Sequence, residues 1–417
     1  MKVLIVGGGG REHALALGLD RDPEVDALHA APGNPGLATV ADLHHVDVLD
    51  PAAVVALARR LTVDLVVVGP EAPLVAGVAD ALRSAGFACF GPDREAAAIE
   101  GSKAFAKEVM AAAGVPTAES RVCTTPAEVE AALARFGPPY VVKDDGLAAG
   151  KGVLVTPDPR AAADHAAGCS RVVIEEFLDG PEVSLFAICD GRTALPLQPA
   201  QDYKRLGDGD AGPNTGGMGA YSPLPWAPGD LVDGVSEAVI GPTLAELAGR
   251  RTPFVGLLYT GLALTAAGPR VVEFNARFGD PETQALLERL DTPLGWLLHA
   301  AACGRLSDVD QLRWRPDAAV SVVMAAAGYP GSPRTGDPVH GIAAAEALDG
   351  VRVHHAGIAF GGIRERELVT SGGRVLAVTG TGASLDVARE RAYAGVAEIS
   401  FSGAVYRHDI GSAVGSR

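Results

Sequence analysis

The stretch that decides the fold is Val271-Val272-Glu273-Phe274-Asn275-Ala276-Arg277-Phe278-Gly279-Asp280-Pro281-Glu282, an apolar, β-branched run that ends in polar residues. A strand over Val271–Phe274 places Val271, Glu273 and Asn275 on one face, because side chains alternate along a strand. A carboxylate and a carboxamide oxygen then lie side by side, and such a donor pair suits Mg²⁺. Arg277 extends this face with a guanidinium that fits a carboxylate or a phosphate. A surface salt bridge of Arg277 with Glu273 or Asp280 explains the stretch equally well, and the rest of the chain has to decide.

Length and composition restrict the class of protein. A chain of 417 residues is long enough for about three domains, each with its own core. A net charge of −16 and a pI of about 5.1 argue against a nucleic-acid or anionic-membrane partner. The five cysteines lack metal-site or Cys-x-x-Cys spacing, and the N-terminus lacks the features of a signal peptide. We therefore expect a cytoplasmic monomer that acts on small molecules and has no membrane span.

Three predicted strands in the first hundred residues end in polar loops that contain glycine. The strand Lys2–Val6 runs into Gly7–Gly10 and then into a helix, an arrangement that presents backbone N–H groups to an anion. The strand Val25–Ala30 runs into residues 31–36, Ala-Pro-Gly-Asn-Pro-Gly, and Leu65–Val68 runs into Gly69-Pro70-Glu71. A Rossmann NAD site would place an acidic residue after the second strand, and none follows it here. Tight turns also favour glycine and proline, but the three loops together favour a phosphorylated small molecule over NAD.

Lysine is rare in this chain, and its positions are informative. Only six of the 35 basic residues are lysines, and five of these lie between positions 103 and 204. A lysine that is kept where arginine is the usual choice indicates a place for a flexible point charge. Lys103 and Lys107 lie four residues apart on a predicted helix, whereas Lys143 and Lys151 belong to a strand–glycine loop–strand segment over 140–155. This loop lacks the Ser/Thr and the helix of a Walker loop, but it can fold over a triphosphate with Lys143 directed at the phosphates. A solvated hairpin tip is the alternative.

A short connector, Glu175–Glu182, follows the next predicted strand, which begins at Val172. It contains Phe177 and Leu178 and leads into a further strand near Glu182. The backbone N–H and C=O groups of such a connector can bind adenine, and Glu182 is placed to accept hydrogen bonds from ribose hydroxyls.

The strand with Lys143 and its glycine loop, the Glu175–Glu182 connector and the Glu273-x-Asn275 pair together resemble the ATP-grasp fold. The match narrows with Gln201–Arg205, Gly212–Tyr221 and Arg277–Glu282, which resemble the phosphoribosylamine–glycine ligase family. Gly7–His13, Gly33–Gly36 and the tail Tyr406–Gly411 resemble it too, so the similarity covers essentially the whole chain. Three positions depart from the pattern: Asp144 replaces a small residue, Tyr203 replaces a histidine, and Gly261 stands where many ATP-grasp enzymes carry an additional metal-binding acid.

The resemblance implies a ligase in which ATP phosphorylates the glycine carboxylate and the amine of phosphoribosylamine then displaces phosphate. A carboxylate is a poor electrophile, so activation is chemically required, and catalysis is then positioning and charge neutralisation. Glu273 and Asn275 are expected to hold Mg²⁺ or Mn²⁺, and Arg277 to clamp the glycine carboxylate. The expected catalytic residues are Arg277, Lys143, Lys151 and Asp202. ATP is expected to contact Lys103, Lys143, Gly150, Lys151, Glu175, Phe177, Leu178 and Glu182. The expected substrate-binding residues are Gly8, Gly10, Arg11, Asn34, Glu71, Lys204, Asn214, Thr215, Gly216, Met218, Arg277 and Gly279.

The predicted fold class is α/β and α+β multidomain. We expect an N-terminal open parallel α/β domain over 1–102, a central ATP-grasp fold over 103–318 with a small lid subdomain at about 120–187, and a C-terminal α+β domain over 319–417. The C-terminal domain should contain strands over Val320–Ala325, Val351–Ala359 and Arg374–Val378 and a helix over Ser384–Ser400. Alternative functions are another ATP-grasp carboxylate–amine ligase, an NAD-dependent dehydrogenase based on Gly7–Gly10, and a nucleotide-binding regulator without catalysis. The dehydrogenase leaves Lys143–Gly152 unexplained, and a regulator would be expected to lose the metal ligands or the lysines.

Overall fold

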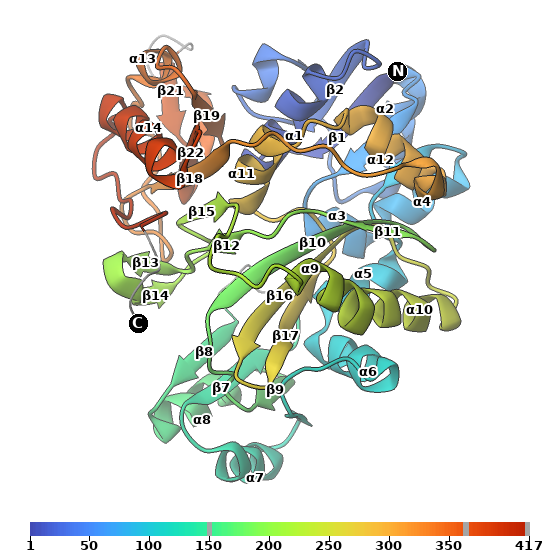
Figure 1. Ribbon diagram of the computed structural model, residues 1–417, viewed down its shortest axis with the longest axis vertical. Coiled ribbons are helices and arrows are strands. Elements are labelled where there is room, and N and C mark those ends of the chain that lie inside the picture. Colours follow the sequence, from blue (N-terminus) through green and yellow to red (C-terminus); the bar gives the residue numbers. More distant parts are fainter. Residues whose placement is uncertain (148–151, 362–366, 413–417) are drawn as a thin grey trace.

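The computed structural model describes residues 1–147, 152–361 and 367–412. Its N-terminal part is an open parallel sheet in the order β3-β2-β1-β4-β5 (Figure 1). The strands are β1 (Lys2–Gly7), β2 (Ala27–Pro32), β3 (Asp42–Leu43), β4 (Leu65–Val68) and β5 (Ala88–Phe90), and the helices are α1 (Gly10–Asp20), α2 (Pro51–Leu61), α3 (Glu71–Ala76), α4 (Val78–Ser84) and α5 (Arg94–Gly101). The strand order reverses between β1 and β4, so the loops after these two strands lie where open α/β sheets bind ligands.

The second strand begins two residues later than predicted. Val25 belongs to a turn, in which its N–H donates to the carbonyl of Asp22 at 3.0 Å, and β2 starts at Ala27. The prediction included Val25 because it is apolar, as the strand residues are.

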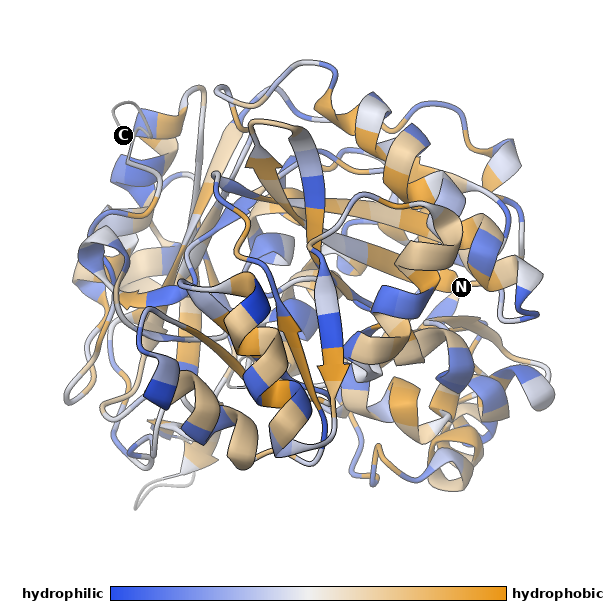
Figure 2. Ribbon diagram, turned by 90° about the horizontal axis from the view of Figure 1, so that it is seen from below, coloured by the Kyte–Doolittle hydropathy of each residue, from blue (hydrophilic) through white to orange (hydrophobic). Residues whose placement is uncertain are grey.

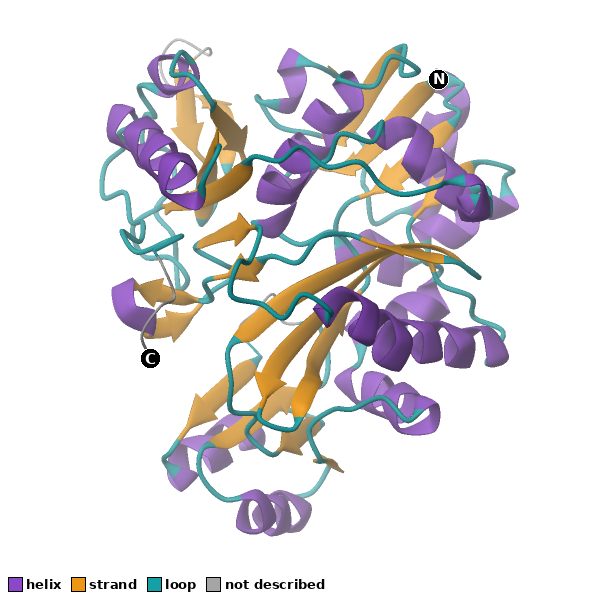
Figure 3. Ribbon diagram, in the orientation of Figure 1, coloured by secondary structure: helices purple, strands orange, loops and turns teal. Residues whose placement is uncertain are grey.

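The central part contains two antiparallel sheets (Figure 3). The smaller sheet has the order β6-β9-β7-β8, from β6 (Ser120–Cys123), β7 (Tyr140–Asp144), β8 (Val153–Thr156) and β9 (Val172–Glu175), with α7 (Pro126–Phe136) and α8 (Pro159–Ala167) packed on it. The larger sheet has the order β11-β10-β16-β17, from β10 (Glu182–Asp190), β11 (Ala194–Pro196), β16 (Val255–Thr265) and β17 (Gly268–Asn275). The helices α6 (Lys103–Ala113), α9 (Leu231–Val235) and α10 (Gly241–Gly249) complete this part. Lys143 therefore lies on the smaller sheet and the Glu273–Asn275 pair on the larger one. The connector between β9 and β10 joins the two sheets.

A bulge in β17 corrects one prediction about the deciding stretch. Glu273 pairs with Gly261 of β16 whereas Val271 pairs with Leu262, so Val272 is an extra residue in the ladder. The Val271 side chain is completely buried in the core, as is nearly all of Phe274. Val272, Glu273 and Asn275 instead border a cavity. The prediction that Val271 shares the face of Glu273 is wrong, because the bulge interrupts the alternation, but Glu273 and Asn275 do lie side by side.

The C-terminal sheet recruits strands from the middle of the chain. Its order is β12-β15-β18-β22-β19, and β12 (Gln201–Asp202) and β15 (Gly219–Ser222) precede β18 (Ala318–Ala325), β19 (Val351–His355) and β22 (Arg374–Gly382) by about a hundred residues or more. Helices α13 (Ile342–Glu346) and α14 (Leu385–Glu398) pack on it, and Ser384 caps α14 by accepting from the Val387 N–H. Two hairpins are separate, β13 (Arg205–Gly207) with β14 (Ala211–Asn214), and β20 (Ile358–Gly361) with β21 (Glu367–Thr370). The predicted single strand 351–359 is thus two strands, β19 and β20, separated by a turn at Ala356-Gly357.

Helices α11 (Glu282–Arg289) and α12 (Leu294–Ala302) carry the chain from β17 back to the N-terminal sheet. Their leucines share one core cluster with Val3, Ile5 and Leu15 of that sheet and its first helix. In Figure 2 the helices carry hydrophobic residues beside hydrophilic ones, as expected for helices that cover a core. No helix in the described ranges is long and apolar enough to cross a bilayer.

Candidate active site

A cavity of about 1420 Å³ opens where the three parts of the molecule meet. The N-terminal sheet contributes Arg11 and Glu71, the smaller central sheet Lys143, the larger one Glu273 and Asn275, and the C-terminal sheet Arg374. Of the residues predicted from the sequence to form the site, the cavity is bordered by Arg11, Glu71, Lys103, Lys143, Glu175, Phe177, Leu178, Glu182, Asp202, Lys204, Asn214, Thr215, Gly216, Glu273, Asn275 and Arg277. Gly150 and Lys151 lie outside the described residues.

Two lysines hold one glutamate at the wall formed by β7 and β9. The Lys143 Nζ donates to the carbonyl of Val272 at 2.9 Å and forms an ion pair with Glu175. The second carboxylate oxygen of Glu175 lies 2.6 Å from the Nζ of Lys107, which also donates to Thr117 Oγ1 at 2.9 Å. Burial lowers the pKa of Lys107, and Glu175 opposes that shift. Because two buried ammonium groups share one carboxylate, this wall retains an excess positive charge suited to phosphate.

Lys107 was not assigned a role from the sequence. It is one of the six lysines and lies one helical turn from Lys103 on α6, and that rarity was the available signal. Lys103 itself donates to the carbonyl of Gly146 at 2.9 Å, where the glycine-rich loop begins. The two lysines of α6 therefore serve different contacts.

The connector after β9 provides the apolar end of the cavity. Phe177 and Leu178 border it, and the Phe177 side chain is 46% exposed. Val141, Val155 and Met110 border the cavity as well. The Glu175 carboxylate is paired with the two lysines at this end of the cavity.

Glu273 and Asn275 offer two oxygen donors to the cavity. Burial raises the pKa of Glu273, but Lys204, Lys143, Lys103 and Arg277 together hold it below the ordinary value, so the group is a carboxylate at neutral pH. No cluster of three or more metal-binding His, Cys, Asp or Glu occurs in the part of the chain that the structure describes. A Cβ on Gly261, directly opposite in β16, would lie 3.4 Å from Glu273 Cγ. The pair therefore fits a hard cation that takes its remaining ligands from phosphate oxygens and water.

Next to this pair lies a group of alternating charges. Lys204 Nζ is 2.8 Å from Glu182 Oε2 and 3.8 Å from Glu273 Oε1. Burial raises the pKa of Asp202 to about 7, with Lys204 opposing the shift and Glu282 adding to it. Asp202 can thus accept or hold a proton near neutral pH, a property required of a group that handles an amine.

Arg277 lies, largely but not completely buried, between two glutamates. Its Nε lies 3.3 Å from Glu71 Oε2, and its Nη2 lies 3.0 Å from Glu100 Oε1. Burial lowers the pKa of Arg277, but Glu100 and Glu71 outweigh this and raise it above the ordinary value. The alternative partners suggested by the sequence, Glu273 and Asp280, form no ion pair with Arg277 in the described structure.

Five predicted substrate residues lie behind the cavity wall, where they hold its loops in place. A Cβ on Gly8 would lie 2.6 Å from the Gly33 carbonyl oxygen, so two loops pack here without room for a side chain. Asn34 joins these loops to the C-terminal sheet, because its Nδ2 donates to the carbonyls of Gly8 and His355 at 2.9 and 2.8 Å. Gly10 packs against Gln284 and Gly279 against Glu282. Met218 is completely buried, and its side chain is not among the described residues that border the cavity.

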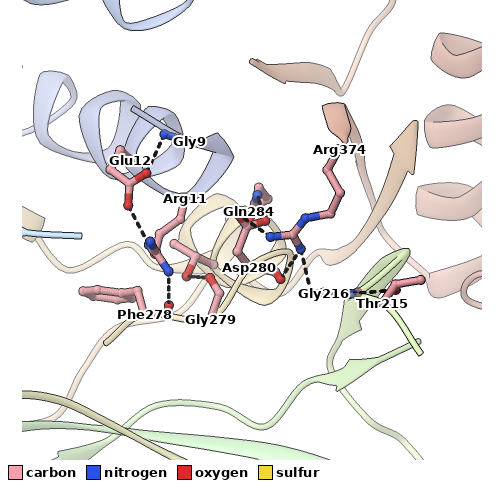
Figure 4. Close-up of polar contacts among 12 residues, drawn as sticks. Gly9, Arg11, Glu12, Thr215, Gly216, Phe278, Gly279, Asp280, Gln284 and Arg374 are labelled. Carbon is pink, nitrogen blue, oxygen red and sulfur yellow. Dashed lines mark hydrogen bonds and ion pairs between the residues drawn. The ribbon is translucent and has the colours of Figure 1, made fainter. Parts of the chain in front are cut away.

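Arg11 and Arg374 approach the same corner from opposite ends of the chain (Figure 4). Arg11 Nη1 donates to the Phe278 carbonyl at 3.2 Å, and its Nε lies 2.6 Å from Glu12 Oε1. Arg374 of β22 donates to the carbonyls of Gly216 and Asp280 at 2.7 and 2.6 Å and lies 3.3 Å from Asp280 Oδ2. Arg374 was missed in the sequence, where Ser371-Gly372-Gly373 before it indicates only a turn.

Comparison with known proteins agrees with this geometry. Family models described as the phosphoribosylglycinamide synthetase N domain, ATP-grasp (A) domain and C domain match residues 1–100, 101–283 and 319–413. A phosphoribosylamine–glycine ligase of Streptomyces coelicolor is 64% identical over 412 residues, which are 98% of each chain. A solved phosphoribosylamine–glycine ligase of Thermotoga maritima is 33% identical with a TM-score of 0.85, covering 98% of this chain and 100% of that one.

A more distant structure shares the fold alone. It is the biotin carboxylase domain of a 2-oxoglutarate carboxylase from Hydrogenobacter thermophilus, solved with MgADP, ADP and bicarbonate. It is 16% identical with a TM-score of 0.74, covering 97% of this chain and 91% of that one. The predicted fold class is confirmed by the three domain models and by the Thermotoga structure. The chain belongs to the phosphoribosylamine–glycine ligase family of ATP-dependent, metal-using ATP-grasp enzymes.

Proposed function

We propose that this enzyme joins glycine to 5-phosphoribosylamine in two steps and so forms glycinamide ribonucleotide, ADP and phosphate. In the first step a glycine carboxylate oxygen takes the γ-phosphoryl group of ATP, and in the second the amine attacks the acyl carbon and phosphate leaves with that oxygen. The observation that carries the proposal is the single cavity in which the lysine wall, the Glu273–Asn275 pair and the Arg11 corner converge. An ATP-dependent C–N ligase needs these three functions, and the family's activity supplies the substrates.

We assign the roles as follows. Lys103 and Lys143 contact the phosphates, with Gly150 and Lys151 completing that side, and the connector at Phe177–Leu178 holds adenine. Arg277 binds the glycine carboxylate, which would replace one of its two glutamate partners. Asp202 and Lys204 lie beside the amines, and the corner at Arg11 and Glu71 holds phosphoribosylamine. Asn214, Thr215 and Gly216 form the remaining wall.

Glu273 and Asn275 would hold the divalent metal, and we propose Mg²⁺ with Mn²⁺ as a substitute. When bound, the metal neutralises phosphate charge. The solved Hydrogenobacter relative in complex with MgADP supports the choice of Mg²⁺.

We also propose that the enzyme is a cytoplasmic monomer with the domain division 1–102, 103–318 and 319–417. Because β12 and β15 belong to the C-terminal sheet, this division separates two strands from the rest of their sheet. Helices α11 and α12, which the division assigns to the central domain, pack on the core of the N-terminal domain.

The reaction is tested with purified enzyme, unlabelled ATP, phosphoribosylamine, and glycine that carries ¹⁸O at both carboxylate oxygens. We expect ADP release that requires both glycine and phosphoribosylamine, a product with the mass of glycinamide ribonucleotide, and one ¹⁸O atom in the released phosphate. ADP release with another acid and amine, and none with this pair, would contradict the proposed substrates. Unlabelled phosphate with correct product would contradict the acyl phosphate step. Omission of glycine or amine is the control.

A further inference from the structure

The loop Asn214–Met218 touches the Asp280-Pro281 turn at a close contact. Gly217 has a φ of +112°, and a Cβ there would lie 2.5 Å from Pro281 Cδ and 3.3 Å from the Asp280 carbonyl oxygen. Glycine is required for both reasons. Gly217 N–H donates to Thr215 Oγ1 at 3.0 Å, and Thr215 in turn bonds to the carbonyl of Lys204. The contact therefore joins the substrate loop to the Arg277–Glu282 motif.

Two side chains of the C-terminal sheet region hold this loop at Gly216. The Gly216 N–H donates to the hydroxyl of Tyr329 at 2.9 Å, and the Gly216 carbonyl accepts from Arg374 Nη1 at 2.7 Å. The same Nη1 donates to the Asp280 carbonyl at 2.6 Å, so Arg374 bridges two carbonyls across the contact. Gly216 is exposed, and a Cβ there would lie 3.2 Å from Arg374 Cζ and 3.3 Å from the Tyr329 hydroxyl.

The contact between Gly217 and the Asp280-Pro281 turn lies next to the glycine loop of the N-terminal sheet. A Cβ on Gly9 would lie 4.0 Å from Asp280 Oδ2, and one on Gly10 would lie 3.8 Å from Asp280 Oδ1. Asp280 also binds Gln284, whose Nε2 donates to Oδ1 at 2.9 Å. A shift of this contact would therefore move Asp280 against Gly9 and Gly10, the residues that precede Arg11 of the cavity wall.

We infer that Tyr329 and Arg374 are positioning residues that set the Gly216 loop and, through it, the affinity for the phosphoribosyl substrate; this rests on the proposed function. Arg374 borders the cavity and could act by touching the substrate, but among the described residues that border the cavity Tyr329 is absent. The hydroxyl of Tyr329 is linked to the cavity wall by its hydrogen bond with Gly216, the bond that Tyr329→Phe removes, whereas its ring packs on Gly373. The two residues should consequently affect the same ligand and should not act independently.

The test uses Tyr329→Phe, Arg374→Lys and the double variant, with Arg391→Met as the matched control. Arg391 is on the same C-terminal domain, where it donates to the Thr381 carbonyl at 2.7 Å and pairs with Asp349 outside the cavity. The readouts are calorimetric Kd values for glycinamide ribonucleotide, the KM values for ATP and glycine, and the melting temperature. The stable product is used as the probe of the ribosyl corner.

We expect Tyr329→Phe to weaken glycinamide ribonucleotide binding about 3- to 10-fold, because one neutral hydrogen bond is lost. Arg374→Lys keeps the charge, but its single nitrogen on a shorter stem cannot bond both carbonyls and also pair with Asp280 Oδ2, as Nη1 and Nη2 do together, and should weaken it about 10- to 100-fold. The KM for ATP should change less than about twofold, and the double variant should lose less than the product of the single losses, because both act through one loop. Arg391→Met should leave the Kd unchanged even where it lowers the melting temperature.

Several results would overturn the inference. Normal product binding in Tyr329→Phe means that the loop does not transmit the effect, and strictly multiplicative losses mean that Arg374 acts by itself. An equal loss of ATP and product affinity means a general loss of structure. If Arg374→Lys fails to fold, the Tyr329→Phe result alone decides. A wild-type enzyme that does not bind glycinamide ribonucleotide contradicts the proposed function instead.

Discussion

At the scale of single residues, Lys143 is bound by two protein acceptors before a nucleotide enters. Replacing it with Met keeps much of the stem but removes a charge-assisted contact worth roughly 1.5–3 kcal/mol. We expect Lys143→Met to raise the Kd for Mg-ATP at least about tenfold and to lower kcat, as measured by calorimetry and ADP release. Glu175 is then left with Lys107 alone, so the variant should also be less stable. Normal ATP binding in a folded Lys143→Met would place the triphosphate elsewhere. Lys107→Met serves as the comparison that removes the other ammonium.

Arg277→Lys tests the proposed clamp on glycine. Lysine offers one point donor where arginine offers two parallel N–H groups, so we expect a drop of about 10- to 150-fold in kcat/KM for glycine. The KM values for ATP and phosphoribosylamine should change much less. The structure provides the competing role, because Arg277 joins Glu71 of α3 to Glu100 of α5. A lower melting temperature with an unchanged glycine KM would assign Arg277 to that bridge.

At the scale of elements, the glycine-rich loop and helix α6 are joined by Asp145. Its buried carboxylate accepts from the Ala104 N–H at 3.1 Å and the Ser102 hydroxyl at 3.0 Å and pairs with Arg171. It thereby supports the cap that Ser102 provides at the start of α6. We expect Asp145→Ala to lower stability by about 1–2 kcal/mol, measured by thermal unfolding. Asp144→Ala, which removes the neighbouring carboxylate at the end of β7, is the matched control. A loss for Asp144→Ala as large as that for Asp145→Ala would argue against the capping role.

At the scale of the whole molecule, three buried histidines join the N- and C-terminal sheets. His13 Nδ1 accepts from the His355 N–H at 2.9 Å, and His354 has no hydrogen-bond partner for either ring nitrogen among the described residues. Burial, with Arg352 and Arg21 adding to it, lowers the pKa of His354 to about 3, and burial lowers that of His355 to about 4. The buried rings therefore stay neutral at a pH at which the same histidines of the unfolded chain take up protons, so acid favours the unfolded state.

We therefore expect stability to be complete above about pH 6.5 and to fall as the pH drops from there toward 3. For His354 alone the loss between pH 7.5 and 5 is about 2 kcal/mol. His354→Leu should keep or raise the melting temperature at pH 7.5, because neither ring nitrogen is bonded, and should flatten its fall toward pH 5. The exposed His340→Gln is the control. An unchanged pH slope in His354→Leu would show that this ring does not carry the acid sensitivity.

The sequence by itself determined features that depend on residues close together in the chain. The α/β strands and glycine loops of the first hundred residues, the order of strand, lysine and glycine loop, and the adjacency of Glu273 and Asn275 follow from periodicity and short spacing. The family resemblance then extended these local features to a reaction. A pair two residues apart survived even the bulge at Val272, because the bulge lies just before it.

Only the tertiary structure decided which distant side chains share a contact. Lys143 and the Val272 carbonyl are 129 residues apart, Arg277 and Glu71 are 206 apart, and Arg374 and Asp280 are 94 apart. Local propensity carries no information about such pairs, because each partner is chosen by how sheets pack and how the ladder register falls. The side chain of Val271 likewise points into the core because of the bulge in β17. The ion pair of Lys107 likewise depends on β9, which places Glu175 beside it. Burial then fixed the charges, since a side chain excluded from water must find its counter-ion within the protein.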